Sequence, residues 1–216
     1  MKKDIALRTT FDSQAELYQA IRPHYPEVLF NTLVKIARLK KDSNLLEIGP
    51  GTGQATEPLA KIGYKITAVE LGAELANVAR RELKKYKNVE ILPGAFEEIE
   101  LSPKSFDLIY AATAFHWIKP DIKFTKTHEL LKPEGHLAII GTNHVSDEAG
   151  DDFFFAAQPM YKKYKHGENY DEFFRLPQAA QLKADPVDEN LFTPIFFKIL
   201  VCVLSIKLRF LSASSL

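Results

Sequence analysis

The hydrophobic and polar positions of this 216-residue chain follow two periods, one typical of strands and one typical of helices. Five apolar runs have strand length, at residues 44–48, 65–69, 89–92, 107–112 and 136–140. Helical spacing of apolar side chains occurs over residues 55–62, 73–83 and 122–131. Because the short runs are apolar on both faces and are separated by helices, the pattern predicts an α/β fold. Its centre is a doubly wound, Rossmann-like, mostly parallel sheet covered on both sides.

Two helices are predicted before the first strand. Ser13 and Glu16 have the spacing of a capping box that opens a helix over residues 14–21. Pro26 begins a second helix, which places three apolar residues on one face, namely Leu29, Leu33 and Ile36. Further along, Gly63 is suited to end a helix, and the Lys-Pro-Glu-Gly run at residues 132–135 predicts a turn before the next strand.

Composition and charge limit the classes of protein that this chain fits. Hydrophobic residues make up 46% and charged residues 26%, which is typical of a globular protein. Lys plus Arg and Asp plus Glu are both 28, so net charge provides no attraction to nucleic acid or to a membrane surface. The lone Cys202 cannot form an internal disulfide, and the first residues lack a secretory pattern. We therefore expect a cytoplasmic protein with no nucleic-acid partner.

The segment "LLEIGPGTGQAT" at residues 45–56 contains the first candidate chemistry. Its glycines have the spacing G-x-G-x-G, and Gln54 stands where a dinucleotide fingerprint requires a third glycine. Glu47 lies at the end of the preceding strand, where its carboxylate would face a ligand. Unit charges about 4 Å apart interact by roughly 4 kcal/mol at an effective dielectric constant near 20. Glu47 therefore disfavours a diphosphate and favours a cation.

A second acid completes the description of the ligand. Glu70 ends the second strand about twenty residues after the glycines, where a carboxylate can accept both hydroxyls of a ribose. A ligand with an amine, a ribose and no phosphate is S-adenosylmethionine. At this point the sequence resembles the class I S-adenosylmethionine-dependent methyltransferases. The resemblance is carried by residues 47–53, Glu70, "SFDLIYAATAFHW" and "LLKPEGHLAII". The runs "AELYQAIRPHYP" and "AFHW" further resemble a branch that includes trans-aconitate methyltransferase and type 11 methyltransferase-like proteins.

The resemblance implies a cofactor role for most of these residues. Glu47 would bind the methionine amino group, directly or through water, and Glu70 would bind the ribose hydroxyls. Tyr18 and Arg22 would close over the methionine end, where Arg22 could pair with the carboxylate. The turn that lines the methionine and ribose comprises Gly49, Pro50, Gly51, Thr52, Gly53 and Gln54.

The adenine and the acceptor are assigned in the same way. Leu71 would lie against one side of the adenine, and Ala95 and Phe96 against the other. Many relatives carry Asp at the position of Ala95, where it reaches the adenine amino group. Ala95 cannot make that contact with its side chain, so Phe96 or the backbone would have to suffice. Ala112 and Thr113 would lie beside the sulfonium.

No side chain is expected to bind a metal, because the six histidines lack metal-binding spacing.

Two aromatic residues after the fourth strand are the candidates for acting on the acceptor. His116 is the candidate general base, since its ordinary pKa is near neutrality. Trp117 would shape the acceptor pocket. The alternative is that both side chains only pack the loop. The run "MYKKYKHGENYDEFF" mixes aromatic residues with lysines, as a nucleic-acid-binding segment can, but it is expected to be a helix of the segment between the fifth and sixth strands. The lysines of that segment would be solvated, and Phe153, Tyr161, Tyr164 or Phe173 would face a substrate cleft or the core.

The C-terminal segment departs from the family pattern. Residues 191–216 contain no acid and no glycine, and Lys198 and Lys207 interrupt any apolar span long enough for a membrane. Residues 195–203 are predicted to form the sixth strand, and the seventh is predicted to be absent. An incomplete C-terminal strand pair would suggest a truncated or frameshifted reading frame, with an exposed edge strand.

These observations predict one methyltransferase domain over residues 1–216. It divides into a helical cap (1–38), a cofactor-binding core (39–145), a helical substrate-side segment (146–190) and an apolar tail (191–216). The predicted function is methyl transfer from S-adenosylmethionine to a small-molecule acceptor, by a monomer or homodimer with no membrane partner. The alternatives are a protein that binds S-adenosylmethionine without transferring its methyl group, and a nicotinamide oxidoreductase.

Overall fold

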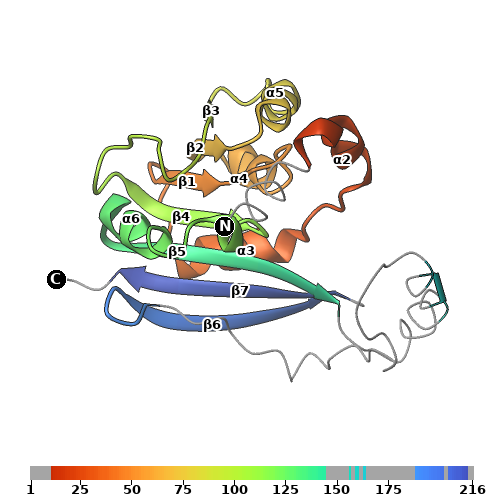
Figure 1. The fold of residues 1–216 in the computed structure, drawn as a ribbon. Coiled ribbons are helices and arrows are strands. Elements are labelled where there is room, and N and C mark those ends of the chain that lie inside the picture. The colour runs from red at the N-terminus through yellow and green to blue at the C-terminus, as the bar shows by residue number, and fades with distance from the viewer. Residues whose placement is uncertain are drawn as a thin grey trace.

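A seven-stranded sheet forms the centre of the structure (Figure 1). The structure is a computed structural model, and it describes residues 11–144, 156, 159, 160, 163, 188–201 and 204–213. Its strands are β1 (Asn44–Ile48), β2 (Lys65–Glu70), β3 (Val89–Pro93), β4 (Phe106–Ala112), β5 (Leu131–His144), β6 (Phe192–Val201) and β7 (Leu204–Ala213). They lie in the order β3-β2-β1-β4-β5-β7-β6. The first five are mutually parallel, which confirms the predicted doubly wound sheet.

The five predicted strands are all present, and β5 is longer than expected. It begins at Leu131, so the turn predicted at residues 132–135 lies within the strand. The register with β4 shifts between Phe106 and Leu108, and Glu134 has a φ of 62°. The Lys-Pro-Glu-Gly run therefore makes an irregularity in the strand, as a bulge does, and does not separate the strand from the helix before it.

The prediction of an incomplete C-terminal strand pair is wrong. β6 and β7 pair antiparallel from Phe192↔Ala213 to Val201↔Leu204, and β7 also pairs antiparallel with β5. The overlooked signal is the alternation of apolar and polar residues over 204–210, which is typical of an antiparallel strand. The expectation of a truncated or frameshifted reading frame rested on the missing seventh strand and on the change in composition, and the presence of β7 removes the first of these two grounds.

Helices cover both faces of the sheet, as the apolar strands require. The helices are α2 (Ala15–Ile21), α3 (Glu27–Ile36), α4 (Thr56–Ile62), α5 (Ala73–Glu82) and α6 (Lys123–Leu130). On one face, α3 and α4 pack Leu33 and Leu59 against Leu45 of β1, and α5 packs there against β2 and β3. On the other face, Leu130 of α6 packs with Leu46 in a second cluster. Gly63 ends α4 with a φ of 109°, as predicted.

The N-terminal cap contains a short 3₁₀ helix, η1 (Asp12–Gln14), followed directly by α2. Gln14 is the N-cap of α2, so the capping box predicted for Ser13 and Glu16 does not mark the start of that helix. The Glu16 carboxylate instead accepts two hydrogen bonds from the Arg81 guanidinium of α5, one of them from Nη2 to Oε2 at 2.9 Å. Asp12 Oδ1 accepts the Leu75 N–H at 3.0 Å. These two contacts dock the cap on α5.

Most of the predicted helical segment 146–190, including Phe153, Tyr161, Tyr164 and Phe173, lies outside the described residues, as do residues 1–10. Within the described part of the chain, no helix is long and apolar enough to cross a membrane.

Candidate cofactor and acceptor site

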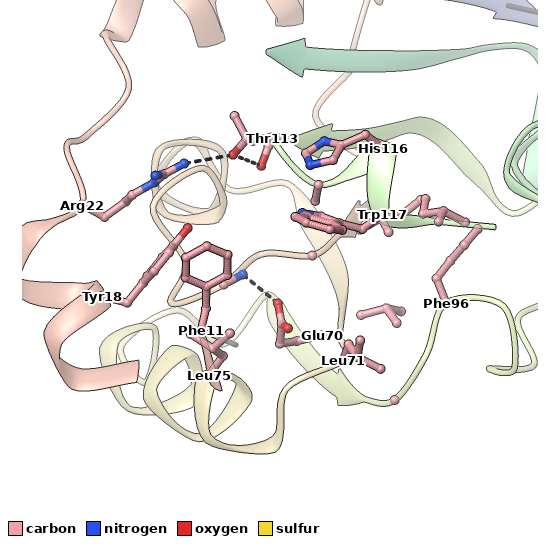
Figure 2. A pocket seen from close by; sticks show the side chains of 18 of the residues that line it. Phe11, Tyr18, Arg22, Glu70, Leu71, Leu75, Phe96, Thr113, His116 and Trp117 are labelled. Atoms are coloured by element: carbon pink, nitrogen blue, oxygen red, sulfur yellow. Dashed lines mark hydrogen bonds between the residues drawn. The ribbon is translucent and has the colours of Figure 1, made fainter. Parts of the chain in front are cut away.

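A cavity of about 360 Å³ opens at the carboxyl ends of β1, β2 and β4, beside the N-terminal cap (Figure 2). This is where ligands bind in open α/β sheets, because the strand order reverses between β1 and β4. Eleven of the predicted site residues line it: Tyr18, Arg22, Gly49, Gly51, Glu70, Leu71, Phe96, Ala112, Thr113, His116 and Trp117. The structure thus brings together residues from across the first 117 positions.

Glu47 does not line this cavity and is fully buried. Its Oε2 atom accepts hydrogen bonds from Thr56 Oγ1 at 2.6 Å and from the Tyr110 hydroxyl at 2.7 Å. Its Oε1 atom has no hydrogen-bond partner among the described residues. Burial raises the pKa of Glu47 to about 7, although the two hydroxyl donors oppose that rise and the nearby Glu70 adds to it. A buried acceptor of this kind matches a cationic ligand group.

Glu70 is held at the end of β2 by the backbone on both sides. Its Oε2 accepts the Gly51 N–H at 2.8 Å and its Oε1 accepts the Gly72 N–H at 2.9 Å. Burial raises the pKa of Glu70, and these backbone donors lower it. Each carboxylate oxygen has a further lone pair for a ligand hydroxyl. The backbone contacts fix the carboxylate against the wall of the cavity, as Figure 2 shows.

Two glycines of the turn after β1, Gly49 and Gly51, line the cavity. Gly49 has a φ of 68°, and a Cβ atom there would lie 2.6 Å from the Ala114 Cβ. Gly51 has a φ of 59°, and a Cβ there would approach the Tyr18 ring to 3.3 Å. Both positions need glycine for conformation and for space. They allow a ligand to approach the backbone closely.

The cap reaches the end of β4 through a small polar cluster. Arg22 donates a hydrogen bond to Thr113 Oγ1 at 3.3 Å, and the Tyr25 hydroxyl lies 3.3 Å from the same oxygen. The Arg22 guanidinium lies 5.4 Å from the centre of the Tyr18 ring. Thr113 has a φ of 55°, which is unusual for a β-branched residue. Arg22 thus lies at the predicted methionine end and contacts Thr113.

The predicted acceptor residues line the cavity beside Thr113 (Figure 2). His116 and Trp117 belong to a 3₁₀ helix, η2 (Phe115–Trp117), that follows β4. Their rings are 4.6 Å apart between centroids. Phe96, which comes after β3, is buried and lies at the far end of the cavity from Arg22 (Figure 2).

Six predicted residues do not line this cavity. Glu47, Pro50 and Gln54 line a separate small cavity of about 20 Å³, together with Tyr18 and Arg22. Thr52, Gly53 and Ala95 line neither. Thr52 accepts a hydrogen bond from Gln54 Nε2 at 2.6 Å, and Gly53 has a φ of 101°, with Leu83 close to where a Cβ would lie. These two residues shape the turn.

Eight further residues line the larger cavity and were not predicted from the sequence: Phe11, Ile48, Val69, Leu75, Gly94, Ala114, Ile118 and Thr142. Ile48, Val69 and Gly94 lie at strand ends beside predicted site residues, so strand order alone could have indicated them. Phe11 and Leu75 come from the cap and α5, and no sequence pattern pairs these elements. Among the described residues, no group of three or more His, Cys, Asp or Glu is placed to hold a metal ion.

Comparisons with known proteins agree with this geometry. Residues 46–139 match the family model described as a methyltransferase domain. An uncharacterized methyltransferase-like protein of Schizosaccharomyces pombe is 32% identical over 141 residues, which are 65% of this chain and 54% of that protein. The chain spans about half the length of the first curated relatives it matches.

Solved structures share the fold at low sequence identity. A S-adenosylmethionine-dependent methyltransferase from Aquifex aeolicus has a TM-score of 0.57 at 18% identity, covering 92% of this chain and 97% of that one. Haemonchus contortus phosphoethanolamine N-methyltransferase 2, in complex with S-adenosylmethionine, has a TM-score of 0.54 at 22% identity, covering 76% and 40%. Residues 46–139 thus match a methyltransferase domain, and the chain shares its Rossmann-like fold with these solved methyltransferase structures.

Proposed function

We propose that this protein is a methyltransferase that uses S-adenosylmethionine to methylate a small-molecule acceptor. The observation that carries the proposal is the pair of buried acids at the ends of β1 and β2, on either side of the glycine turn. Burial raises the pKa of both carboxyl groups, and the charge of Glu70 raises the pKa of Glu47 further. A cation bound between them relieves this unfavourable negative charge, whereas a diphosphate increases it.

The residues present fit the cofactor at three points. Glu47 offers a buried acceptor without a partner among the described residues, which suits the methionine amino group. Glu70 offers two carboxylate oxygens beside the cavity for the ribose hydroxyls. Gly49 and Gly51 provide a turn in which any side chain would occupy the space of a ligand or a neighbour. The Haemonchus structure named above holds the same cofactor, which supports the assignment.

The apolar walls are proposed to hold the rest of the cofactor. Leu71 and Phe96 line the cavity and would contact the adenine, whereas Ala95 does not line it and would contribute backbone only. Tyr18 and Arg22 would cover the methionine end from the cap. Arg22 contacts Thr113 in this structure, so binding of a ligand carboxylate would compete with that hydrogen bond.

When bound, the cofactor supplies a methyl group already activated by a sulfonium. The protein needs mainly to align the acceptor with that group, which can contribute up to about 7 to 11 kcal/mol. His116 would remove a proton from an acceptor that needs it, and Trp117 would position the acceptor. Both residues line the cavity together with Ala112 and Thr113, which supports these roles. The trans-aconitate-methyltransferase-like branch, a cytoplasmic location and a monomeric or dimeric state stay predictions.

Binding and product formation test the proposal in sequence. Isothermal titration calorimetry with S-adenosylmethionine, S-adenosylhomocysteine and NADH should show binding of the first two only. A screen of metabolite extracts for a mass gain of one methyl group then identifies the acceptor. Binding of NADH without the other two ligands would contradict the proposal. Binding without product across the extracts would favour the alternative of a cofactor-binding protein.

A further inference from the structure

Two hydroxyl side chains hold the carboxylate of Glu47 from different elements. Tyr110 is the direct register partner of Glu47 where β4 pairs with β1, so the sheet itself brings the phenol to the carboxylate. Thr56 is the first residue of α4, just after the glycine turn. Both hydroxyls donate to Oε2, at 2.6 and 2.7 Å. All three residues are fully buried.

Because both hydroxyls donate to Oε2 of Glu47, Oε1 is left for a ligand. Oε1 is buried and has no hydrogen-bond partner among the described residues. Glu47 lines the small cavity of about 20 Å³, which it shares with Gly49 and Ala112, and these two also line the larger cavity. A cavity of more than about 10–15 Å³ can hold one water molecule when polar groups surround it. The small cavity therefore has room for one water molecule next to the larger cavity.

We propose that Thr56 and Tyr110 are positioning residues, which bind Oε2 of Glu47 and so leave Oε1 as the acceptor for the cofactor's ammonium group or for a water molecule bound to it. This inference rests on the proposed function, because it needs a cationic ligand. It goes beyond the cofactor residues assigned above, since neither hydroxyl touches the larger cavity. The two donors make a carboxylate available in a site where burial favours the neutral acid.

The arrangement couples cofactor binding to a proton. Glu47 has a pKa of about 7, so it is largely protonated below neutral pH. The other ionisable groups that face it are Tyr18 of α2, Arg22 at the C-terminal cap of α2, Tyr25, Glu70 of β2 and Tyr110 of β4. A ligand ammonium stabilises the carboxylate, so binding below neutral pH releases the carboxyl proton to solvent. With a pKa near 7, the ionised fraction of Glu47 and with it the affinity should fall about fifteenfold from pH 7 to pH 5.5.

The test uses S-adenosylhomocysteine and measures affinity by calorimetry between pH 5.5 and pH 7 on the intact chain. Thr56→Val and Tyr110→Phe each remove one donor and keep the shape of the side chain. Each should raise the pKa of Glu47 and weaken binding at pH 7 about fivefold, if the loss of a donor is worth about one pKa unit. Thr56→Ser keeps the hydroxyl, so its affinity should depend on pH as that of the wild-type protein does. Glu47→Gln should remove this part of the pH dependence.

A second measurement needs no ligand. Carbon-13 labelling of glutamate side chains allows the pKa of Glu47 to be followed by NMR, with the Glu47→Gln protein to assign the signal. An upward change in Thr56→Val and in Tyr110→Phe, and none in Thr56→Ser, supports the positioning role. Unchanged Glu47 titration in both donor variants overturns it. If the wild-type protein binds S-adenosylhomocysteine with the same affinity at every pH, this inference fails and the proposed function stands, whereas no binding at any pH overturns both.

Discussion

The replacement Glu47→Gln should stabilise the protein without its cofactor at pH 8 and weaken cofactor binding. In the folded chain burial raises the pKa of Glu47 from its ordinary 4.5 to about 7. The folded state therefore holds this proton more tightly than the unfolded chain does. As pH rises from about 4.5 to 7 the unfolded chain loses the proton first, so the wild-type protein loses stability across that interval.

The size of the effect follows from the two pKa values. Each pKa unit is worth about 1.4 kcal/mol, so ionising buried Glu47 costs about 3 kcal/mol of unfolding free energy at pH 8. Glutamine keeps the acceptor for Thr56 and Tyr110 and carries no charge to bury. We expect Glu47→Gln to be about 3 kcal/mol more stable than wild type at pH 8, and nearly equal to it at pH 4.5.

Urea denaturation at the two pH values measures this difference. Glu57→Gln is the matched control, because Glu57 lies near the surface and its hydrogen bond with Lys85 lowers its pKa. That carboxylate stabilises the folded state above the ordinary pKa, an effect lost as pH falls, so its replacement should cost less than about 1 kcal/mol at pH 8. If Glu47→Gln is no more stable than wild type at pH 8, the argument from burial is refuted.

Three further predictions concern the cavity. Gly49→Ala should destabilise the fold by at least about 1 kcal/mol and reduce S-adenosylhomocysteine affinity, since the new Cβ would meet Ala114. Gly63→Ala is its control, because Gly63 also has a positive φ but has open space around it, and this replacement should lower stability without changing that affinity. Glu70→Gln should weaken S-adenosylhomocysteine binding at least tenfold by calorimetry, because it replaces one acceptor oxygen with a donor next to a backbone N–H; unchanged affinity would contradict its ribose role. His116→Ala should lower kcat about 100-fold once an acceptor is known, with cofactor affinity retained; an unchanged kcat would leave His116 as a packing residue.

The parallel half of the fold could be predicted from the sequence because β1, β2 and β4 are largely buried on both faces. Residues 44–48 are apolar except for Asn44 and Glu47 and are followed by the glycine turn, so strand, turn and acid could be located together. The seventh strand was missed because Lys207 and Arg209 interrupt its apolar residues, as is normal in an antiparallel strand. A search for continuous apolar runs cannot detect that pattern.

The acids of the site could be predicted, but their supports could not. Glu47 and Glu70 stand at strand ends in the sequence, and both lie at the cofactor end of the sheet. Tyr110 reaches Glu47 only because β4 lies next to β1, a neighbour 63 residues away in the chain. Thr56 was part of the quoted turn, yet its direction depends on where α4 begins. Pairings between distant elements come from the topology and not from local pattern.

The position of β7 has a consequence for how the chain folds. β7 follows β6 in the chain but lies between β5 and β6, so β6 has no place in the sheet until β7 is made. Pairing His136 with Ser212 closes a long loop, and such closure is slow compared with helix formation. During synthesis on the ribosome, the edge of β5 therefore stays unpaired until residues 204–213 have been made.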